Sequence, residues 1–149
     1  MTAHAFSRIL VAVDDSPAAL AAVRTAIGLG DLSGARLRFV HILGDGELVR
    51  SLARMGHDGE LALRRSKAAE ALLRHVGAQA DRAGVPADTA CREGEPAGLL
   101  LAEAREWGAD LVVIGRSDVR GAGQASVGAV TRQLLEFTEI PVLVVPRPG

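Results

Sequence analysis

The chain has one cysteine and one lysine among its 149 residues, and its charges nearly cancel. Cys91 alone cannot form a disulfide within the chain, and a single cysteine fits a reducing compartment. A net charge of −1 supplies no cationic field that would favour nucleic acid or an anionic membrane surface. No apolar run approaches the roughly 20 residues needed to cross a bilayer. We therefore expect a cytoplasmic protein with neither a nucleic-acid partner nor a membrane partner.

The length and composition are those of one folded domain. A chain of 149 residues can bury about two-thirds of its unfolded surface without disulfides or metals. Hydrophobic residues make up 48% and charged residues 23%, which is ordinary for a globular protein. No internal repeat or low-complexity segment divides the sequence, so residues 1–149 are predicted to form a single domain.

Strand-forming runs recur along the chain. They are predicted at 9–13, 37–42, 87–92, 111–114 and 142–145. The first, Ile9-Leu-Val-Ala-Val13, is continuously apolar, which is typical of a strand covered on both faces. The run at 87–92 follows Val85-Pro86 and is less apolar, so it is expected at or near an edge of the sheet.

Segments of helical periodicity lie between these strands. The first begins at Pro17, because proline suits the first helical turn, and is predicted to end at Gly28 and Gly30. After an irregular connection over 43–59 comes a long helix whose arginines form a solvated face. The apolar face of this long helix carries Ala69, Leu72, Leu73, Val76 and Ala80. A third helix is predicted over 94–107. The fourth helix is lined by Val127, Val130, Leu134 and Phe137. This alternation predicts a parallel sheet with right-handed crossovers.

The ends of two strands are the expected place for a site. In open parallel sheets, ligands sit beyond the carboxyl ends of the strands, where the strand order reverses. Asp14 ends the first strand and Gly115 ends the fourth. The fourth strand is followed by a loop of small residues and then by Gly128 at a helix start. Such an arrangement can present unpaired backbone N–H groups and a partial positive charge to an anion.

A set of motifs stands in a fixed order along nearly the whole chain. The motifs are Ile9-Leu-Val-Ala-Val-Asp-Asp-Ser, Phe39-Val-His-Ile, Gly94-Glu-Pro-Ala, Ala109-Asp-Leu-Val-Val-Ile-Gly, Gly128-Ala-Val and Ile140-Pro-Val-Leu-Val-Val. Together they resemble the universal stress protein family. The resemblance implies an α/β fold of the adenine nucleotide alpha hydrolase-like type, an open five-stranded parallel sheet in the order 3-2-1-4-5 with helices on both faces.

The same resemblance implies a homodimer and a nucleotide cleft. The dimer would pair the last strands antiparallel, through Val142, Leu143, Val144 and Val145. An apolar edge strand left bare would favour aggregation, which gives this pairing an independent physical motive. In the cleft, Asp14 would hold the ribose hydroxyls and the Ile42 backbone would meet adenine. The full nucleotide-binding set implied is Ala12, Val13, Asp14, Ile42, Gly115, Arg116, Ser117, Asp118, Arg120, Gly128, Ala129 and Val130.

Two positions depart from the glycine pattern of ATP-binding members, although Gly115 and Gly128 match it. Position 118 is aspartate instead of glycine, and position 129 is alanine instead of serine or threonine. A carboxylate beside a triphosphate costs on the order of 1–4 kcal/mol, and the missing hydroxyl costs roughly 0.5–1.5 kcal/mol. Arg116 and Arg120 could offset part of this loss through charge-assisted contacts. The expected ligand is ATP or AMP, the monophosphate being less penalised, and no metal is predicted.

Other nucleotide and phosphate sites fit the sequence poorly. Asp14-Asp15-Ser16 resembles the acidic pair of response-regulator receiver domains, but these domains need a lysine after the last strand. Lys67, the only lysine, lies within the predicted long helix. Gly121-Ala-Gly-Gln-Ala-Ser nearly matches the dinucleotide fingerprint, but it does not directly follow a strand. No Gly-Lys-Ser/Thr sequence is present, which excludes an ordinary Walker A loop.

Catalysis finds little support in the side chains. His41 is interpreted as a packed histidine, Cys91 as a buried small hydrophobe, and Ser16 as the cap of the first helix. His57 and His75 lack metal-ligand spacing. No catalytic residue is therefore assigned, and the most that is expected is slow ATP hydrolysis. Two functions stay open: a regulatory nucleotide-binding module whose occupancy changes dimer shape or partner choice, and a stress-response dimer that acts through protein contacts without nucleotide.

Overall fold

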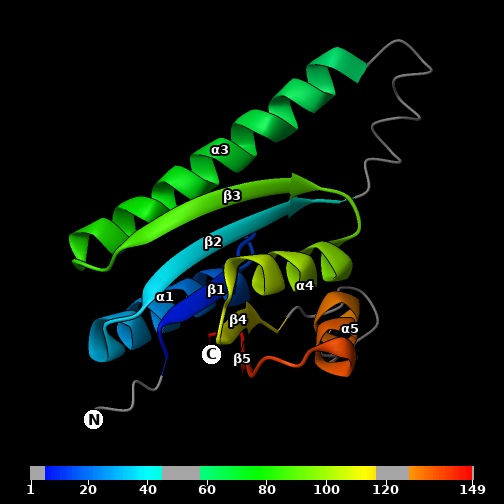
Figure 1. The fold of residues 1–149 in the computed structure, drawn as a ribbon. Coiled ribbons are helices and arrows are strands. Elements are labelled where there is room, and N and C mark those ends of the chain that lie inside the picture. Colours follow the sequence, from blue (N-terminus) through cyan, green and yellow to red (C-terminus); the bar gives the residue numbers. More distant parts are fainter. Residues whose placement is uncertain (1–5, 45–57, 117–127, 149) are drawn as a thin grey trace.

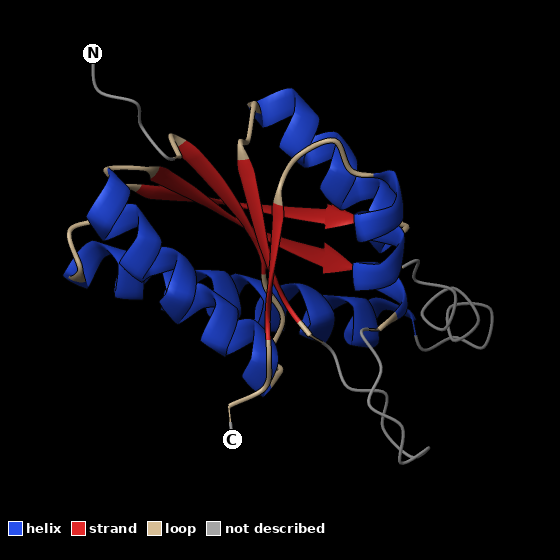
Figure 2. Ribbon diagram, turned by 90° about the horizontal axis from the view of Figure 1, so that it is seen from below, coloured by secondary structure: helices blue, strands red, loops and turns tan. Residues whose placement is uncertain are grey.

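The computed structural model describes residues 6–44, 58–116 and 128–148, which form a parallel sheet with helices on both faces (Figures 1 and 2). The elements in chain order are β1 (Arg8–Ala12), α1 (Pro17–Ser33), β2 (Arg36–Leu43), α3 (Asp58–Arg82), β3 (Ala87–Glu93), α4 (Pro96–Trp107), β4 (Leu111–Gly115), α5 (Ala129–Phe137) and β5 (Val142–Val145). The sheet is 5-stranded in the order β3-β2-β1-β4-β5, and each neighbouring pair is parallel. The predicted fold class and strand order are confirmed.

Both faces of the central strands are buried, and this explains their continuous apolar runs. Side chains alternate between the faces of a strand. Ile9 and Val11 therefore lie in the core beneath α1 and α3, whereas Leu10 lies in the core beneath α4 and α5. Figure 2 shows the two helical layers on opposite sides of the strands. Within the described segments, no helix is long and apolar enough to cross a membrane.

The start of α1 agrees with the sequence, but its end does not. The Ser16 hydroxyl accepts a hydrogen bond from the Ala19 N–H at 3.1 Å, so the predicted cap is confirmed. The helix continues past Gly28 and Gly30 to Ser33 and ends at Gly34, whose φ of 73° is the left-handed conformation that favours glycine. The prediction that Gly28 and Gly30 end the helix is therefore wrong.

Gly30 has a packing role that the local sequence does not reveal. It is buried, and a Cβ built on it would lie 2.8 Å from Val85 Cγ1. Val85 directly precedes Pro86 in the connection between α3 and β3. The glycine thus allows α1 to approach this connection closely, at the cost of helix propensity.

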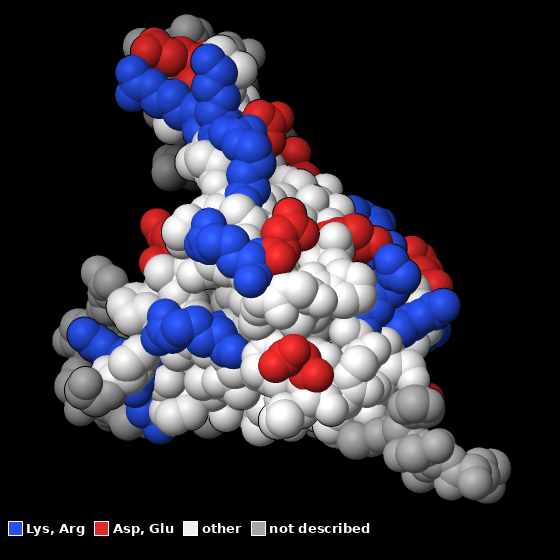
Figure 3. Space-filling view, turned by 90° about the vertical axis from the view of Figure 1, so that its left-hand side faces the viewer, with Lys and Arg blue, Asp and Glu red and all other residues white. Residues whose placement is uncertain are grey.

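Helix α3 buries one face and exposes the other. The side chains predicted for its apolar face are all buried or half-buried: Ala69, Leu72, Leu73, Val76 and Ala80. On the solvated face, Arg64 pairs with Glu60 at 2.7 Å and Arg74 with Glu70 at 4.0 Å, with all four side chains exposed. Figure 3 shows basic and acidic side chains interspersed on this side of the molecule. The interpretation of the α3 arginines as a solvated face is confirmed.

Two apolar assignments at the edges of the fold are wrong. Phe137, predicted to line the fourth helix, is 66% exposed because α5 ends there, beyond the part of the helix that packs on the sheet; Val127 lies outside the described residues. Cys91 is exposed rather than buried, because β3 is an edge strand, as predicted. Partial burial, and then the nearby Glu70 and Glu93 carboxylates, raise the pKa of the Cys91 thiol.

Candidate functional site

The carboxyl ends of β1 and β4 lie side by side in the sheet. Ile9 pairs with Leu111 and Val11 with Val113, so the two strands run side by side in parallel toward the same edge of the sheet. The strand order reverses here, because the chain first adds β2 and β3 on one side of β1 and later adds β4 and β5 on the other. The loops that follow Ala12 and Gly115 therefore flank the switch point at which such sheets bind ligands.

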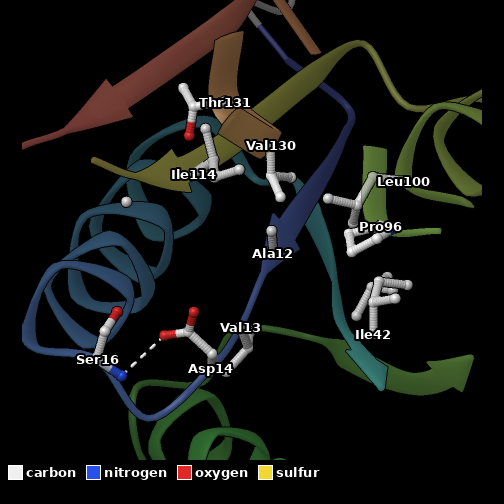
Figure 4. A pocket seen from close by; sticks show the side chains of 12 residues that line it. Ala12, Val13, Asp14, Ser16, Ile42, Pro96, Leu100, Ile114, Val130 and Thr131 are labelled. Atoms are coloured by element: carbon white, nitrogen blue, oxygen red, sulfur yellow. Dashed lines mark hydrogen bonds between the residues drawn. The ribbon is translucent and has the colours of Figure 1, made fainter. Parts of the chain in front are cut away.

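A pocket of about 180 Å³ opens at this point (Figure 4). Its lining residues are Ala12, Val13, Asp14, Ser16, Val40, Ile42, Pro96, Leu100, Ile114, Gly115, Val130 and Thr131. Half of them belong to the nucleotide-binding set expected from the sequence: Ala12, Val13, Asp14, Ile42, Gly115 and Val130. Gly128 and Ala129 stand at the start of α5 beside Val130 and are not part of the lining. Ser117, Asp118 and Arg120 lie outside the described residues, and Arg116 directly follows β4.

Several lining residues were missed by sequence reasoning. Pro96 and Leu100 lie on α4, and Figure 4 shows them with Ile42 on one side of the pocket. The sequence predicts α4, but only the crossover places it over the ends of β1 and β2. Thr131, in the first turn of α5, is 1% exposed. The sequence did contain a signal for Thr131: it is a polar residue on the otherwise apolar face of the helix.

The turn that carries Asp14 is fixed by one hydrogen bond within the turn and by two to residues of β2. The Ser16 N–H donates to Asp14 Oδ1 at 2.8 Å, and the Val13 N–H donates to the Val40 carbonyl at 2.8 Å. His41 Nδ1 lies 2.7 Å from the Val13 carbonyl oxygen, which can only accept, so Nδ1 carries a proton and donates. A carboxylate can accept up to about four hydrogen bonds, so Asp14 keeps capacity for a ligand hydroxyl.

Gly115 is required by packing. A Cβ built on it would lie 2.5 Å from the Ala18 carbonyl carbon, 2.6 Å from the Ala19 nitrogen and 2.7 Å from the Ala18 oxygen. All three are backbone atoms in the first turn of α1, so no side-chain rotation could make room. This glycine lets the start of α1 rest directly on the end of β4, which brings Ser16 and Gly115 into the same pocket.

The amino-terminal end of α5 faces the same region. Gly128 has φ 88° and ψ 150°, a conformation that side chains rarely adopt, and its carbonyl accepts the Arg132 N–H at 3.0 Å. The first N–H groups of a helix have no partner within the helix, and the helix dipole adds partial positive charge there. Among the described residues, no side chain caps this helix. This end of α5 is therefore suited to an anion next to the pocket.

The pocket offers binding groups rather than a catalytic or metal-binding cluster. Among the described residues that line it, Asp14 is the one ionisable side chain. Across the described segments, no three histidine, cysteine, aspartate or glutamate side chains converge in a way that could hold a metal ion. What the geometry provides is an apolar wall, a carboxylate and the start of a helix around a single opening.

Comparison with known proteins identifies the family. The universal stress protein family matches residues 5–146. This chain belongs to that family. The universal stress protein YxiE of Bacillus subtilis is 28% identical over 147 residues, covering 94% of this chain and 99% of the relative. The family predicted from the ordered motifs is therefore confirmed.

Solved structures show the same fold over almost the full chain. One is a universal stress protein in complex with cAMP, with a TM-score of 0.70 at 22% identity, covering 96% of this chain and 98% of that one. Another is the universal stress protein from Archaeoglobus fulgidus in complex with dAMP, with a TM-score of 0.69 at 23% identity, covering 93% and 97%. At these identities the likeness shows the fold, in agreement with the predicted adenine nucleotide alpha hydrolase-like class.

Proposed function

We propose that this universal stress protein is a cytoplasmic regulatory module that binds an adenine nucleotide in the pocket between β1 and β4. The observation that carries the proposal is the convergence of three kinds of group on one opening. An apolar wall, the Asp14 carboxylate and the start of α5 come from segments far apart in the chain, yet they surround the same cavity. Each part suits one part of a nucleotide.

The apolar wall suits the flat face of a purine base. Ile42, Pro96 and Leu100 lie together on one side of the pocket, and Val130 lies opposite Asp14 (Figure 4). Small-molecule pockets are lined mainly by apolar side chains, with a few polar groups that fix orientation. Ile42 is near the end of β2, where its backbone can present polar groups to the edge of a base.

Asp14 and the start of α5 suit the ribose and the phosphate. A carboxylate accepts hydrogen bonds from vicinal hydroxyls, and backbone N–H groups at a helix start bind anions. The cavity of about 180 Å³ is smaller than the ~300–1,000 Å³ of typical ligand pockets, so it would enclose only part of a nucleotide. Its size therefore favours a nucleoside monophosphate over ATP, as do Asp118 and Ala129 in the phosphate loop, which we propose to be weakened. Neighbours of the same fold crystallised with cAMP and dAMP support this ligand class.

The chemistry of the pocket favours a regulatory role over enzymatic turnover of the nucleotide. Asp14 is engaged by the Ser16 N–H and is the one ionisable group among the described lining residues, so these residues supply no general acid–base pair. We propose that the protein works as a homodimer through β5. Val145 accepts from the Arg116 N–H and Pro141 from the Val112 N–H, so the N–H and C=O groups of Val142 and Val144 point to the outer edge. Leu143, between them, is 37% exposed.

Titration calorimetry on desalted protein tests the nucleotide proposal. We expect AMP and cyclic AMP to bind with micromolar dissociation constants and ATP to bind more weakly. Asp14→Ala should weaken AMP binding by roughly tenfold or more, because a hydrogen bond to a charged group contributes about 1.5–3 kcal/mol. Asp15→Ala is the matched control: it removes the adjacent carboxylate, which is not in the pocket lining, and should leave affinity within about twofold.

A second function, action through protein contacts without nucleotide, is favoured by one observation. Leu135 and Phe137 on α5 are exposed on the described surface, at 45% and 66%. If no adenine nucleotide gives heat with the parent protein, and none gives heat with the Asp118→Gly, Ala129→Ser double variant, the nucleotide proposal fails and this alternative replaces it. Binding that appears only in the double variant would show that the phosphate loop alone has lost the function.

A further inference from the structure

Strand β3 presents an ordered row of backbone groups to the outside of the sheet. The Pro86 carbonyl accepts from the Leu37 N–H at 2.9 Å, and the Gly94 N–H donates to the Leu43 carbonyl at 3.0 Å. The N–H and C=O of one strand residue point to the same side, and this side alternates along the strand. The residues that face β2 are therefore 88, 90 and 92. Ala87, Thr89, Cys91 and Glu93 present their N–H and C=O groups outward, where no described strand pairs with them.

Natural proteins protect such an edge with prolines, bulges or charges. β3 has no proline, and its register with β2 is unbroken from Ala87 to Glu93. Its charged residues are not of one sign, since Asp88 and Arg92 stand on the same face of the strand, four positions apart. A second copy of the strand running in the opposite direction would place unlike charges opposite each other.

We propose that β3 pairs antiparallel with β3 of a second copy of this chain, about a two-fold axis through Ala90. Ala90 is the midpoint of Ala87–Glu93, so this register uses the full length of the strand. It sets Thr89 opposite the partner's Cys91, and these outward-facing residues can exchange backbone hydrogen bonds. A shift along the strand by two residues in either direction would shorten the overlap.

The register about Ala90 also brings oppositely charged side chains of the two copies together. Asp88 comes to lie opposite the partner's Arg92, and Arg92 opposite the partner's Asp88, in non-hydrogen-bonded pairs, whose side chains are closest. Asp88 already accepts from Arg38 at 2.7 Å, and Arg92 donates to Glu103 at 2.6 Å. The Asp88 and Arg92 side chains are still 51% and 38% exposed, and each has further hydrogen-bonding capacity.

The helical layer leaves room for this pairing. α3 packs on both β2 and β3. In the joined sheet the two copies of α3 would lie on the same face, where helices can pack against each other. The groove between α3 and the open edge is lined by the small residues Gly77 and Ala78 together with Glu70 and Arg74. Glu70 and Arg74 can pair across the axis as well as along the helix.

The interface is distinct from the β5 edge, which lies at the other end of the sheet. Pairing at both edges would extend one sheet through more than two copies. The two contacts therefore have to be separated in the test. Leu143→Arg blocks the β5 edge, because antiparallel pairing of Val142–Val145 about Leu143 would bring two introduced guanidinium groups face to face.

Disulfide trapping tests the register directly. In a Cys91→Ser background, the thiols introduced by Ala90→Cys would meet at the axis, with Cα atoms about 4.5 Å apart, within the range for a disulfide. The matched control is Asp88→Cys in the same background, whose thiols would stand roughly 13 Å apart along the strands. We expect mild oxidation to yield a covalent dimer with Ala90→Cys and none with Asp88→Cys. Equal yields from both variants, or none from either, would overturn the proposal.

Charge reversal in the Leu143→Arg background gives an independent measurement. By sedimentation equilibrium, Asp88→Arg and Arg92→Asp should each weaken the dimer by roughly tenfold, because like charges then oppose each other twice. The double variant should recover the parent affinity. The contacts with Arg38 and Glu103 stay broken in the double variant, so recovery reports the contact between copies and not the stability of the subunit. Asp31→Arg, at the far end of α1, is the control and should change nothing. A double variant no tighter than the single ones, or a parent that stays monomeric, would refute the pairing.

Discussion

One methyl group added at Gly115 would show how tightly α1 rests on β4. The new Cβ would lie 2.5–2.7 Å from three backbone atoms of Ala18 and Ala19, far inside van der Waals contact. Overpacking costs about 1–3 kcal/mol, and we expect about 3 kcal/mol here because a helix backbone cannot rotate aside as a side chain does. In a chain of this length, this cost lowers Tm by roughly 6–12 °C.

Two other glycines provide matched controls for Gly115→Ala. Gly28 lies inside α1 with nothing within 4 Å of its Cβ position, so Gly28→Ala should stabilise the protein by about 0.5–1 kcal/mol. Gly30→Ala should fall between the two, because its Cβ would meet the Val85 side chain, which can shift. Urea unfolding followed by circular dichroism measures all three, and an unchanged m-value shows that the same transition is compared. If the unfolding free energy of Gly115→Ala is within about 0.5 kcal/mol of the parent value, packing does not require this glycine.

Three further predictions concern buried or partly buried polar groups. His41→Leu should destabilise the protein by about 1–3 kcal/mol, because the Val13 carbonyl loses its donor, whereas His41→Asn keeps a donor at the same position and should restore most of the stability in urea unfolding. Glu103 is 6% exposed and contacts two partly exposed arginines, so Glu103→Gln should cost about 1–3 kcal/mol in the same urea unfolding. An unchanged stability would show that the ion pairs only offset their own desolvation. The pKa of the Cys91 thiol is raised by partial burial and then by Glu70 and Glu93, so the midpoint of its pH-dependent alkylation should lie higher in the folded than in the urea-unfolded chain. Glu93→Gln should lower that midpoint in the folded protein. An unchanged midpoint would show that the Glu93 carboxylate does not contribute to the raised pKa of Cys91.

The sequence alone determined the order of elements and the family. Apolar runs such as Ile9–Val13 and Leu111–Ile114 identify strands covered on both faces, because a strand buried on two sides needs no polar alternation. Ser16 and Pro17 specify a helix start through local hydrogen bonding and a fixed φ. Asp14 and Gly115 could be assigned to one site because a parallel sheet brings strand ends to a common edge. All of these inferences depend on contacts within a few residues or on a general rule of sheet topology.

The tertiary structure decided what depends on neighbours distant in the sequence. The sequence predicts that Gly30 ends a helix, but in the structure this glycine packs closely against Val85 within α1. The sequence predicts that Cys91 is buried, but it is exposed because β3 is an edge strand. Pro96 and Leu100 join the pocket only because the α4 crossover passes over the ends of β1 and β2. Each of these features depends on a distance between segments that are far apart in the sequence, and no local pattern encodes such a distance. The strands could therefore be predicted from the sequence, whereas the residues that line the pocket walls could not.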